Sequence, residues 1–127
     1  MTYYFIVVPR LSYVRNLDTM NKYKAKKIVH DGITFDSKKE FNRYLELLAM
    51  ADGIKDLQRQ VKFQLTPKMT GVLRTERASH YIADFTYCLG EQKIVEDVKS
   101  DFTRKLPLYI LKRKLMKMIH NIEIVEI

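Results

Sequence analysis

The sequence predicts an α/β or α+β fold with a mixed β-sheet core flanked by helices. Two observations favour it: short β-branched and aromatic runs alternate with turn residues, and two segments place apolar residues at helical spacing. The chain has 127 residues, of which 46% are hydrophobic and 30% charged, so it can bury a core. The single cysteine, Cys88, excludes an intramolecular disulfide and a multi-cysteine zinc site.

The N-terminal part is expected to hold a strand, a connector and a hairpin. Residues 2–8 are aromatic and β-branched, which favours a strand, and residues 10–27 are a polar, basic connector. Asp31-Gly32 then gives the strongest short hairpin signal, between strands at residues 28–30 and 33–35. We place an N-terminal arm over residues 1–21 and the main domain over residues 22–127.

A first helix is expected to begin after Ser37. Ser37 and Glu40 have the spacing of a capping box, and apolar residues then recur at helical spacing as far as Ala51. Gly53 stands where a left-handed residue commonly ends a helix.

The C-terminal half reads as strands followed by a second helix. Pro107 suits the first turn of that helix and Asn121 closes it. Its apolar face would consist of Leu108, Leu111, Leu115 and Met118. The other expected elements are a strand at 61–65, a loop at 68–78, strands at 81–88 and 94–99, and a final strand after residue 121.

The longest apolar run, residues 3–9, is too short to cross a membrane. No basic segment precedes it, so it does not resemble a signal peptide. We therefore expect a cytoplasmic protein that has no membrane partner.

The net charge favours a polyanionic partner. Lys+Arg 23 against Asp+Glu 15 give +8, and the segment from Lys99 to Lys117 holds seven basic residues and one acid. A basic composition without a polyanionic partner is the alternative, and the clustering favours nucleic acid. The expected nucleic-acid-contacting residues are Lys22, Lys24, Lys26, Lys27, Arg104, Lys105, Lys112 and Lys114.

An acid, one spacer and a lysine occur together in three places. These are Asp36-Ser37-Lys38, Glu91-Gln92-Lys93 and Asp97-Val98-Lys99. Spacing does not select among them, but only the third lies in an apolar strand. Since residues two apart in a strand share a face, Asp97 and Lys99 are expected to point the same way.

A second carboxylate is expected beside Asp97. If the hairpin turns between Gly90 and Glu91, Asp84 lies directly opposite Asp97, with Cβ atoms roughly 4.5–5.5 Å apart. Two carboxylates this close repel each other, and a divalent cation removes that repulsion. Carboxylate oxygens are ligands that Mg²⁺ and Mn²⁺ prefer.

Glu40 has two interpretations, and both stay open. It can complete the helix cap that Ser37 begins, or it can be a third acid of the site, because it lies beside the apolar face of the helix. Gln60, just ahead of the 61–65 strand, can contact the substrate or be a surface amide, and the second interpretation is favoured.

Three segments together resemble the PD-(D/E)xK nuclease superfamily, which has the restriction-endonuclease-like fold. They are Ser37-x-x-Glu40, Tyr81-Ile82-Ala83-Asp84 and Glu96-Asp97-Val98-Lys99. Residues 22–127, from Lys22 to the final IEIVEI, are similar to a small phage and prophage branch of it. Ala83 stands where the family name has proline, and Asp97 stands where glutamate is commoner.

The resemblance implies a metal site at one end of a mixed sheet flanked by helices. It implies that Asp84 and Asp97 are metal ligands and that Glu40 is the helix-borne acid. Lys99 would orient or activate the attacking water and stabilise the charge that develops on the phosphoryl group.

The expected function is a Mg²⁺-dependent DNA endonuclease, with Mn²⁺ as a substitute, that hydrolyses phosphodiester bonds. It would act in phage recombination, replication or repair in the cytoplasm of the host cell. No base-reading module is visible in the sequence, which favours structure-selective cleavage of branched or junction DNA. The alternative is a non-catalytic, nuclease-derived DNA-binding or regulatory protein, and retention of the three acids and Lys99 favours the enzyme.

The apolar strand at residues 2–8 also raises the question of oligomeric state. An exposed apolar edge can pair with a second copy to form a homodimer, or the strand can extend its own sheet. Both interpretations stay open.

Overall fold

The computed structural model describes residues 15–17, 26–50 and 52–127. The chain divides into two compact units, which are described separately: unit 1 (Met1–Lys55) and unit 2 (Asp56–Ile127). The strand expected at residues 2–8, with its dimer hypothesis, lies outside the described residues. So do Lys22, Lys24 and the expected domain boundary after residue 21.

Unit 1 contains a three-stranded antiparallel sheet in the order β1 (Arg15–Leu17), β2 (Lys27–His30) and β3 (Ile33–Phe35). The predicted hairpin between β2 and β3 is confirmed, because Asp31 and Gly32 both have positive φ, 48° and 76°. Two consecutive positive φ angles are what a type I′ turn requires. The expectation of a connector without structure was wrong at β1, which pairs with β2.

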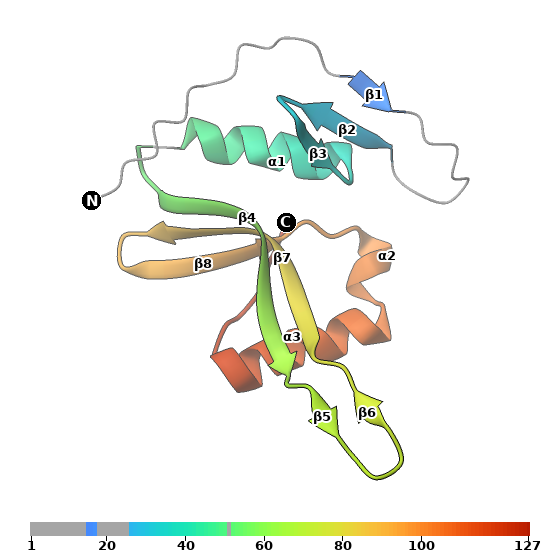
Figure 1. Ribbon diagram of the computed structural model, residues 1–127. Coiled ribbons are helices and arrows are strands. Elements are labelled where there is room, and N and C mark those ends of the chain that lie inside the picture. Colours follow the sequence, from blue (N-terminus) through green and yellow to red (C-terminus); the bar gives the residue numbers. More distant parts are fainter. Residues whose placement is uncertain (1–14, 18–25, 51) are drawn as a thin grey trace. The chain divides into compact units, whose positions relative to one another are not determined.

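The only helix among the described residues of unit 1 is α1 (Lys38–Ala49), shown in Figure 1. Ser37 is its N-cap, and the Ser37 Oγ accepts a hydrogen bond from the Glu40 N–H at 3.1 Å. The C-cap is Met50 and Gly53 does not adopt a left-handed φ, so the prediction for Gly53 was wrong. Phe41 packs against Ile28 and Phe35 of the small sheet, which fixes the helix on that sheet.

Unit 2 contains a four-stranded sheet in the order β4-β7-β8-β9. Its strands are β4 (Lys55–Thr66), β7 (Ser79–Leu89), β8 (Gln92–Asp97) and β9 (Val125–Glu126). β7 and β8 are antiparallel and β8 and β9 are parallel, so the sheet is mixed and the predicted α+β class is confirmed. β4 is much longer than the strand expected at residues 61–65. Its first half is polar and largely exposed, so it lacks an apolar pattern that would identify it.

The turn between β7 and β8 lies where the sequence places it. Gly90 has a φ of 63°, and the paired residues run from Leu89 opposite Gln92 to Phe85 opposite Glu96. This register confirms a turn at Gly90-Glu91. Asp84 and Asp97 are the next residue on each strand.

Two helices follow β8, and the predicted second helix is confirmed as α3 (Pro107–His120). Pro107 occupies the first turn and Asn121 ends the helix in the left-handed region, with a φ of 54°. The short helix α2 (Asp101–Arg104) was not expected from the sequence.

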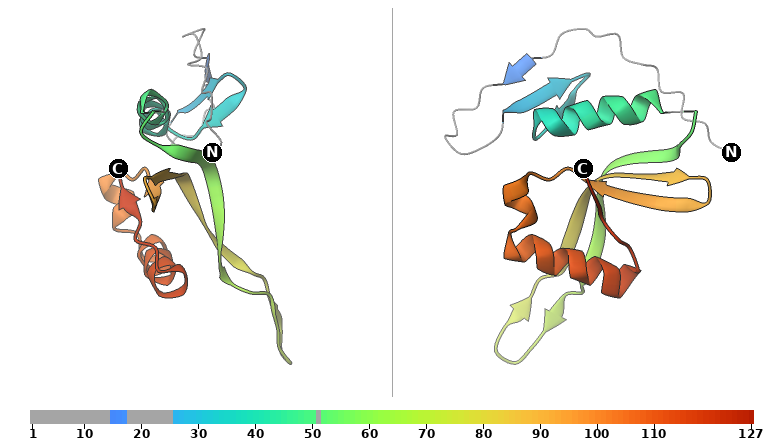
Figure 2. Two further views of the ribbon diagram at one scale, coloured as in Figure 1. Left: turned by 90° about the vertical axis from the view of Figure 1, so that its left-hand side faces the viewer. Right: turned by 180° about the vertical axis from the view of Figure 1, so that it is seen from behind.

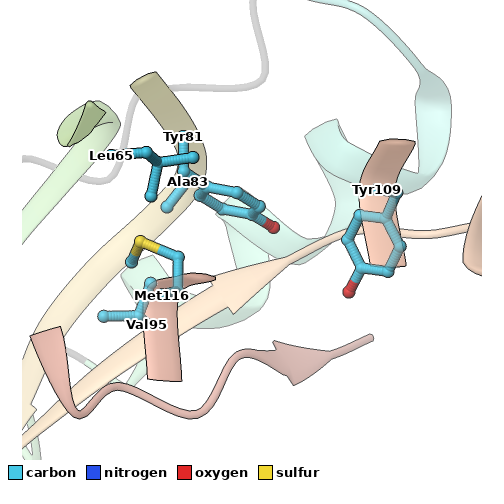
Figure 3. Close-up of a cluster of buried hydrophobic side chains, with 6 residues drawn as sticks. All are labelled: Leu65, Tyr81, Ala83, Val95, Tyr109 and Met116. Atoms are coloured by element: carbon cyan, nitrogen blue, oxygen red, sulfur yellow. The ribbon is translucent and has the colours of Figure 1, made fainter. Parts of the chain in front are cut away.

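The predicted apolar face of α3 was wrong for three of its four residues. Leu108 is 65% exposed, Leu111 54% and Met118 75%, whereas Leu115 is partly buried against the core, and Tyr109 and Met116 are buried. Tyr109 and Met116 are seven residues apart, two helical turns, so they lie on one face of the helix. That face packs on the sheet, and Figure 3 shows Met116 beside Val95 within the core cluster.

The predicted loop at residues 68–78 is a small hairpin of β5 (Met69–Thr70) and β6 (Thr75–Glu76). Figures 1 and 2 show it projecting beyond the end of β4 and β7. Within the part of the chain that the structure describes, no helix is both long and apolar enough to cross a membrane.

Candidate active site

The candidate site of unit 2 is formed around Asp84 of β7 and Asp97 at the end of β8. Two neighbours hold the Asp84 carboxylate: Oδ2 accepts the backbone N–H of Val98 at 2.9 Å and Oδ1 accepts the Gln60 amide at 3.1 Å. Val98 directly follows Asp97, so the carboxylate of Asp84 lies at the end of β8 beside Asp97. β4, β7 and β8 therefore meet in this site.

Asp97 is almost fully buried, with 2% of its surface exposed. The Lys99 ammonium lies 3.0 Å from Asp97 Oδ2, so the two side chains point the same way as predicted, although the strand ends at Asp97 and Lys99 lies beyond it. The Tyr81 hydroxyl donates a hydrogen bond to the same oxygen. A buried carboxylate requires such partners, because burial of an uncompensated charge is costly.

The hydroxyl of Tyr81 is held in its neutral, donating form. Burial raises the pKa of Tyr81 far above its ordinary value of 10.0, and the hydrogen bond to Asp97 raises this pKa further. Tyr81 therefore remains a hydrogen-bond donor to Asp97 over the whole physiological range of pH. Figure 3 shows its hydroxyl directed toward the side of the cluster on which Tyr109 lies.

The backbone that carries Asp97 and Lys99 is fixed by the end of the chain. The Ile127 N–H donates to the Asp97 carbonyl oxygen at 3.0 Å, and the Lys99 N–H donates to the Ile127 carbonyl oxygen at 3.1 Å. The Lys99 ammonium also lies 4.7 Å from the centre of the Tyr109 ring, where a cation is attracted to the aromatic face. Lys99 is therefore positioned by a carboxylate, a ring and its own backbone.

Tyr109 is held in turn by Glu126 on β9. Its hydroxyl donates to Glu126 Oε1 at 2.7 Å, and Arg113 Nη1 lies 2.8 Å from the same oxygen. The Tyr109 hydrogen bond, with help from Arg113 and Arg104, lowers the pKa of Glu126 below its ordinary value of 4.5. Burial, together with the bond to Glu126, raises the pKa of Tyr109, so the phenol stays protonated.

An open pocket of about 290 Å³ lies beside these residues. Lys112 is on its rim, and the Lys112 ammonium donates to the His80 carbonyl oxygen at 3.0 Å. The wall is apolar apart from one acid, the lysines and the tyrosine hydroxyls. The lining residues are Tyr81, Ile82, Asp97, Lys99, Leu106, Leu108, Tyr109 and Lys112.

Glu40 lies in unit 1, and its contacts are those of a helix cap. It is buried, with 3% of its surface exposed, and its Oε2 accepts the Asp36 backbone N–H at 3.0 Å. Its own N–H bonds to Ser37, so the predicted cap is confirmed. The structure brings together Asp84, Asp97 and Lys99 in unit 2, and the metal role of Glu40 stays a prediction.

A metal in unit 2 would depend on two carboxylates. Among residues 15–17, 26–50 and 52–127, no group of three or more His, Cys, Asp or Glu side chains could hold a metal ion. Mg²⁺ is usually bound by one or two protein carboxylates, with waters and substrate phosphates as its other ligands. Asp84 and Asp97 have the donor chemistry for such a site, and Asp97 lines the open pocket.

The predicted DNA-contacting residues differ in their surroundings. Lys105 and Lys114 are exposed in unit 2, and Lys26 is exposed in unit 1. Arg104 Nε lies 3.5 Å from Glu126 Oε2, and the Lys27 ammonium lies 3.7 Å from Asp36 Oδ1. Arg104 and Lys27 therefore each have a carboxylate neighbour in the protein. Any contact of these two residues with a DNA phosphate would be additional to it.

Sequence reasoning missed four residues that support the site. Tyr81 belongs to the Tyr81-Ile82-Ala83-Asp84 motif, so its place near Asp84 could have been inferred. Gln60 is exposed as expected, yet its amide contacts Asp84, 24 residues away. Tyr109 and Glu126 meet only through the pairing of β8 with β9, and no local pattern indicates it.

Comparison with known proteins gives one match. Residues 20–124 match the model of a family described as "Protein of unknown function (DUF1064)". No curated protein and no solved structure matches the chain. The family description gives no activity, so the geometry of unit 2 carries the functional argument.

Proposed function

The chain belongs to the DUF1064 family, and we propose that it is a Mg²⁺-dependent DNA endonuclease. The resemblance of its motifs to PD-(D/E)xK nucleases motivates this proposal. The observation that carries it is the Asp84–Asp97–Lys99 group: Asp84 lies within β7, beside Asp97 at the end of β8, and the Lys99 ammonium is 3.0 Å from Asp97. Asp97 and Lys99 line an open pocket.

The carboxylates and the lysine have distinct tasks in this proposal. Mg²⁺, held by Asp84 and Asp97, would supply Lewis acidity and neutralise negative charge on the phosphodiester. Lys99 donates a hydrogen bond to the attacking water or to a non-bridging phosphate oxygen, because its ammonium lies at the pocket surface. Hydrolysis forms a bond from water oxygen to phosphorus and breaks one ester bond, and the departing oxygen gains a proton.

Tyr81 and Tyr109 act as positioning residues. Tyr81 holds Asp97 through its hydroxyl, and the ring of Tyr109 lies 4.7 Å from the Lys99 ammonium. Placement of the reacting groups before substrate binds removes part of the entropic cost of the reaction. Glu40 is proposed as a further acid, and its cap contacts leave its metal role to experiment.

The basic surface of the chain supports DNA as the substrate. The net charge is +8, and Lys112 on the pocket rim is followed by the exposed Lys114 on the same helix. Lysines beside the pocket would contact backbone phosphates, which gives affinity without base sequence information. Because such contacts do not read base sequence, we propose that the enzyme selects branched or junction DNA by its structure.

A cleavage assay tests the proposal. Purified chain is incubated in Mg²⁺ or Mn²⁺ with labelled duplex, single-stranded, flap and four-way-junction DNA, beside Asp97→Asn and Lys99→Met. Asp101→Asn is the matched control, because Asp101 is an exposed acid four residues after Asp97. We expect cleavage by the wild type and Asp101→Asn only, with branched DNA cut fastest. Equal cleavage by Asp97→Asn and the wild type would show that the active site is elsewhere.

One observation favours the alternative, a non-catalytic DNA-binding protein. Lys99 and the Tyr81 hydroxyl already compensate the charge of Asp97, so this group is stable without a metal. The same assay separates the two functions. DNA binding by the wild type without cleavage of any substrate would establish the binding protein.

A further inference from the structure

The β5–β6 hairpin extends from the two strands that carry Gln60 and Asp84 of the candidate active site. Thr66 at the end of β4 and Ser79 at the start of β7 join its two sides, with Oγ1 and Oγ 2.7 Å apart. The Ser79 N–H also bonds to Thr66 Oγ1 at 3.1 Å. Because β4 carries Gln60 and β7 carries Asp84, the hairpin is anchored on the strands that form the site (Figure 1).

The tip of this hairpin presents two aliphatic side chains to solvent. Val72 is 103% exposed and Leu73 is 88% exposed. The turn is closed by a hydrogen bond of 2.9 Å from the Gly71 N–H to the Arg74 carbonyl oxygen. A Cβ at Gly71 would lie 3.2 Å from that oxygen, so the turn is tight. Apolar groups held out in water on an ordered turn are a common sign of a binding site.

Cations surround this apolar tip. Lys68, Arg74 and Arg77 are exposed on the hairpin, and one acid, Glu76, lies 3.9 Å from Arg74. This combination of an apolar tip and flanking cations fits double-stranded DNA, whose phosphates carry negative charge and whose stacked bases can receive an apolar wedge.

We propose that the β5–β6 hairpin is a DNA-distorting arm. Val72 and Leu73 insert between neighbouring base pairs and unstack them, and the three cations contact the flanking phosphates. The inference rests on the proposed function for its partner, DNA, and adds a physical reason for structure selectivity. Branched or mismatched DNA already has unstacked bases, so insertion there is less costly than in a perfect duplex.

The arm would act close to the cleaved bond. The chain runs eleven residues from Leu73 to Asp84, and at ~3.3 Å per residue this spans at most about 36 Å. One turn of duplex DNA is about 34 Å. Distortion at the tip would therefore fall within about one turn of the phosphodiester at Asp84 and Asp97.

Base unstacking and binding are measured without divalent metal, so that cleavage does not interfere. The probe is a duplex with 2-aminopurine placed at successive positions, whose fluorescence rises when the base unstacks. A double variant, Val72→Ser with Leu73→Ser, is compared with Leu111→Ser with Met118→Ser, which alters two exposed apolar residues of α3 in the same unit. We expect wild type and control to raise the fluorescence, and the tip variant to lose this rise and bind about tenfold more weakly.

Three results would overturn the arm. The first is no unstacking by the wild type, and the second is equal unstacking by the tip variant and the wild type. The third is a lower molecular mass, measured by light scattering, for the tip variant alone, which would show that the tip is a contact between copies of the chain. Cleavage of the same duplex in Mg²⁺ reports on the proposed function separately. Unstacking that depends on the tip, without cleavage, supports the arm and contradicts the nuclease; cleavage with tip-independent unstacking does the reverse.

Discussion

The two units hold their candidate acids in different ways. Glu40 of unit 1 accepts a hydrogen bond from Asp36, four residues away, and its N–H bonds to Ser37, three residues away. In unit 2, Asp84 bonds to Val98 and Asp97 to Tyr81, partners 14 and 16 residues away. The first acid belongs to a helix start, and the others belong to a sheet assembled from distant segments.

This difference matters for the interpretation of the motif. Both of these Glu40 contacts belong to the start of the helix: its N–H bonds to Ser37, and its carboxylate accepts the N–H of Asp36, the residue before the N-cap. No helix cap or turn needs a carboxylate at Asp84 or Asp97; Asp84 lies within β7, and the buried Asp97 ends β8 and lines the pocket. A buried charge in a pocket is a common sign of a functional site. Unit 2 is therefore the better candidate for the functional site.

The largest effect is expected from a substitution of Asp84 in unit 2. Asp84→Asn keeps an acceptor for the Val98 N–H but removes the negative charge. Cleavage of branched DNA should fall about a thousandfold or more, because one proposed metal ligand contributes several kcal/mol to the transition state. Initial rates in Mg²⁺, with DNA affinity measured in parallel, check this. Unchanged rates would remove Asp84 from the site.

Glu40→Gln tests whether the acid of unit 1 has a role besides the helix cap. Glutamine still accepts the Asp36 N–H, so the cap survives, while a metal ligand would be lost. We expect cleavage to fall by at least about tenfold with little change in melting temperature. Ser37→Ala is the control: it should lower the stability by about 1 kcal/mol and leave the cleavage rate at low temperature intact. A wild-type rate in Glu40→Gln would leave Glu40 as a cap only.

A smaller effect is expected at two tyrosines that form a matched pair. Tyr81 donates to Asp97 and Tyr87 donates to Glu96, each a buried acid. Tyr81→Phe and Tyr87→Phe should each lower the free energy of unfolding by about 1–3 kcal/mol, because each leaves a buried acceptor less satisfied. Denaturant unfolding measures this.

The two tyrosine variants should differ in catalysis. Only Tyr81→Phe should slow cleavage, by several-fold, because only Asp97 is proposed to bind the metal. Equal slowing by both variants would indicate a general loss of stability rather than positioning by Tyr81.

The smallest effect concerns pH and Glu126. The pKa of Glu126 is lowered from its ordinary value of 4.5, chiefly by the Tyr109 hydrogen bond. Below pH 4.5 the unfolded chain therefore binds more protons at this group than the folded chain, so stability falls as pH drops through the lowered pKa. Glu126→Gln should remove that part of the pH dependence and cost about 1 kcal/mol or less at pH 7. Unfolding curves between pH 3 and 7 check this; an unchanged pH slope would contradict it.

The local elements could be predicted from short-range sequence patterns. Asp31-Gly32 predicts the hairpin, which has two positive φ angles, and Pro107 and Asn121 mark the two ends of α3. Gly90 gave the turn, and with it the register from Leu89–Gln92 to Phe85–Glu96. These features depend on the conformational preferences of a few adjacent residues, which the sequence shows directly.

Local patterns failed wherever a distant segment decided the outcome. The aliphatic spacing of α3 predicted a face of Leu108, Leu111, Leu115 and Met118. Of these only Leu115 packs against the core, and the helix buries Tyr109 and Met116 instead. Tyr109 is better placed there because its hydroxyl reaches Glu126 and its ring faces Lys99. Helical spacing gives a face, but only the partner surface decides which of two apolar faces is buried.

The candidate site divides in the same way. Asp84, Asp97 and Lys99 could be predicted from the sequence, because one turn relates the two acids and Lys99 is two residues from Asp97. Only the tertiary structure added Tyr81, Gln60 and the Tyr109–Glu126 pair, since these contacts join β4, β7, β9 and α3 across 16 to 24 residues of chain. Contacts of that range follow from packing, which depends on the whole sheet and not on any one segment.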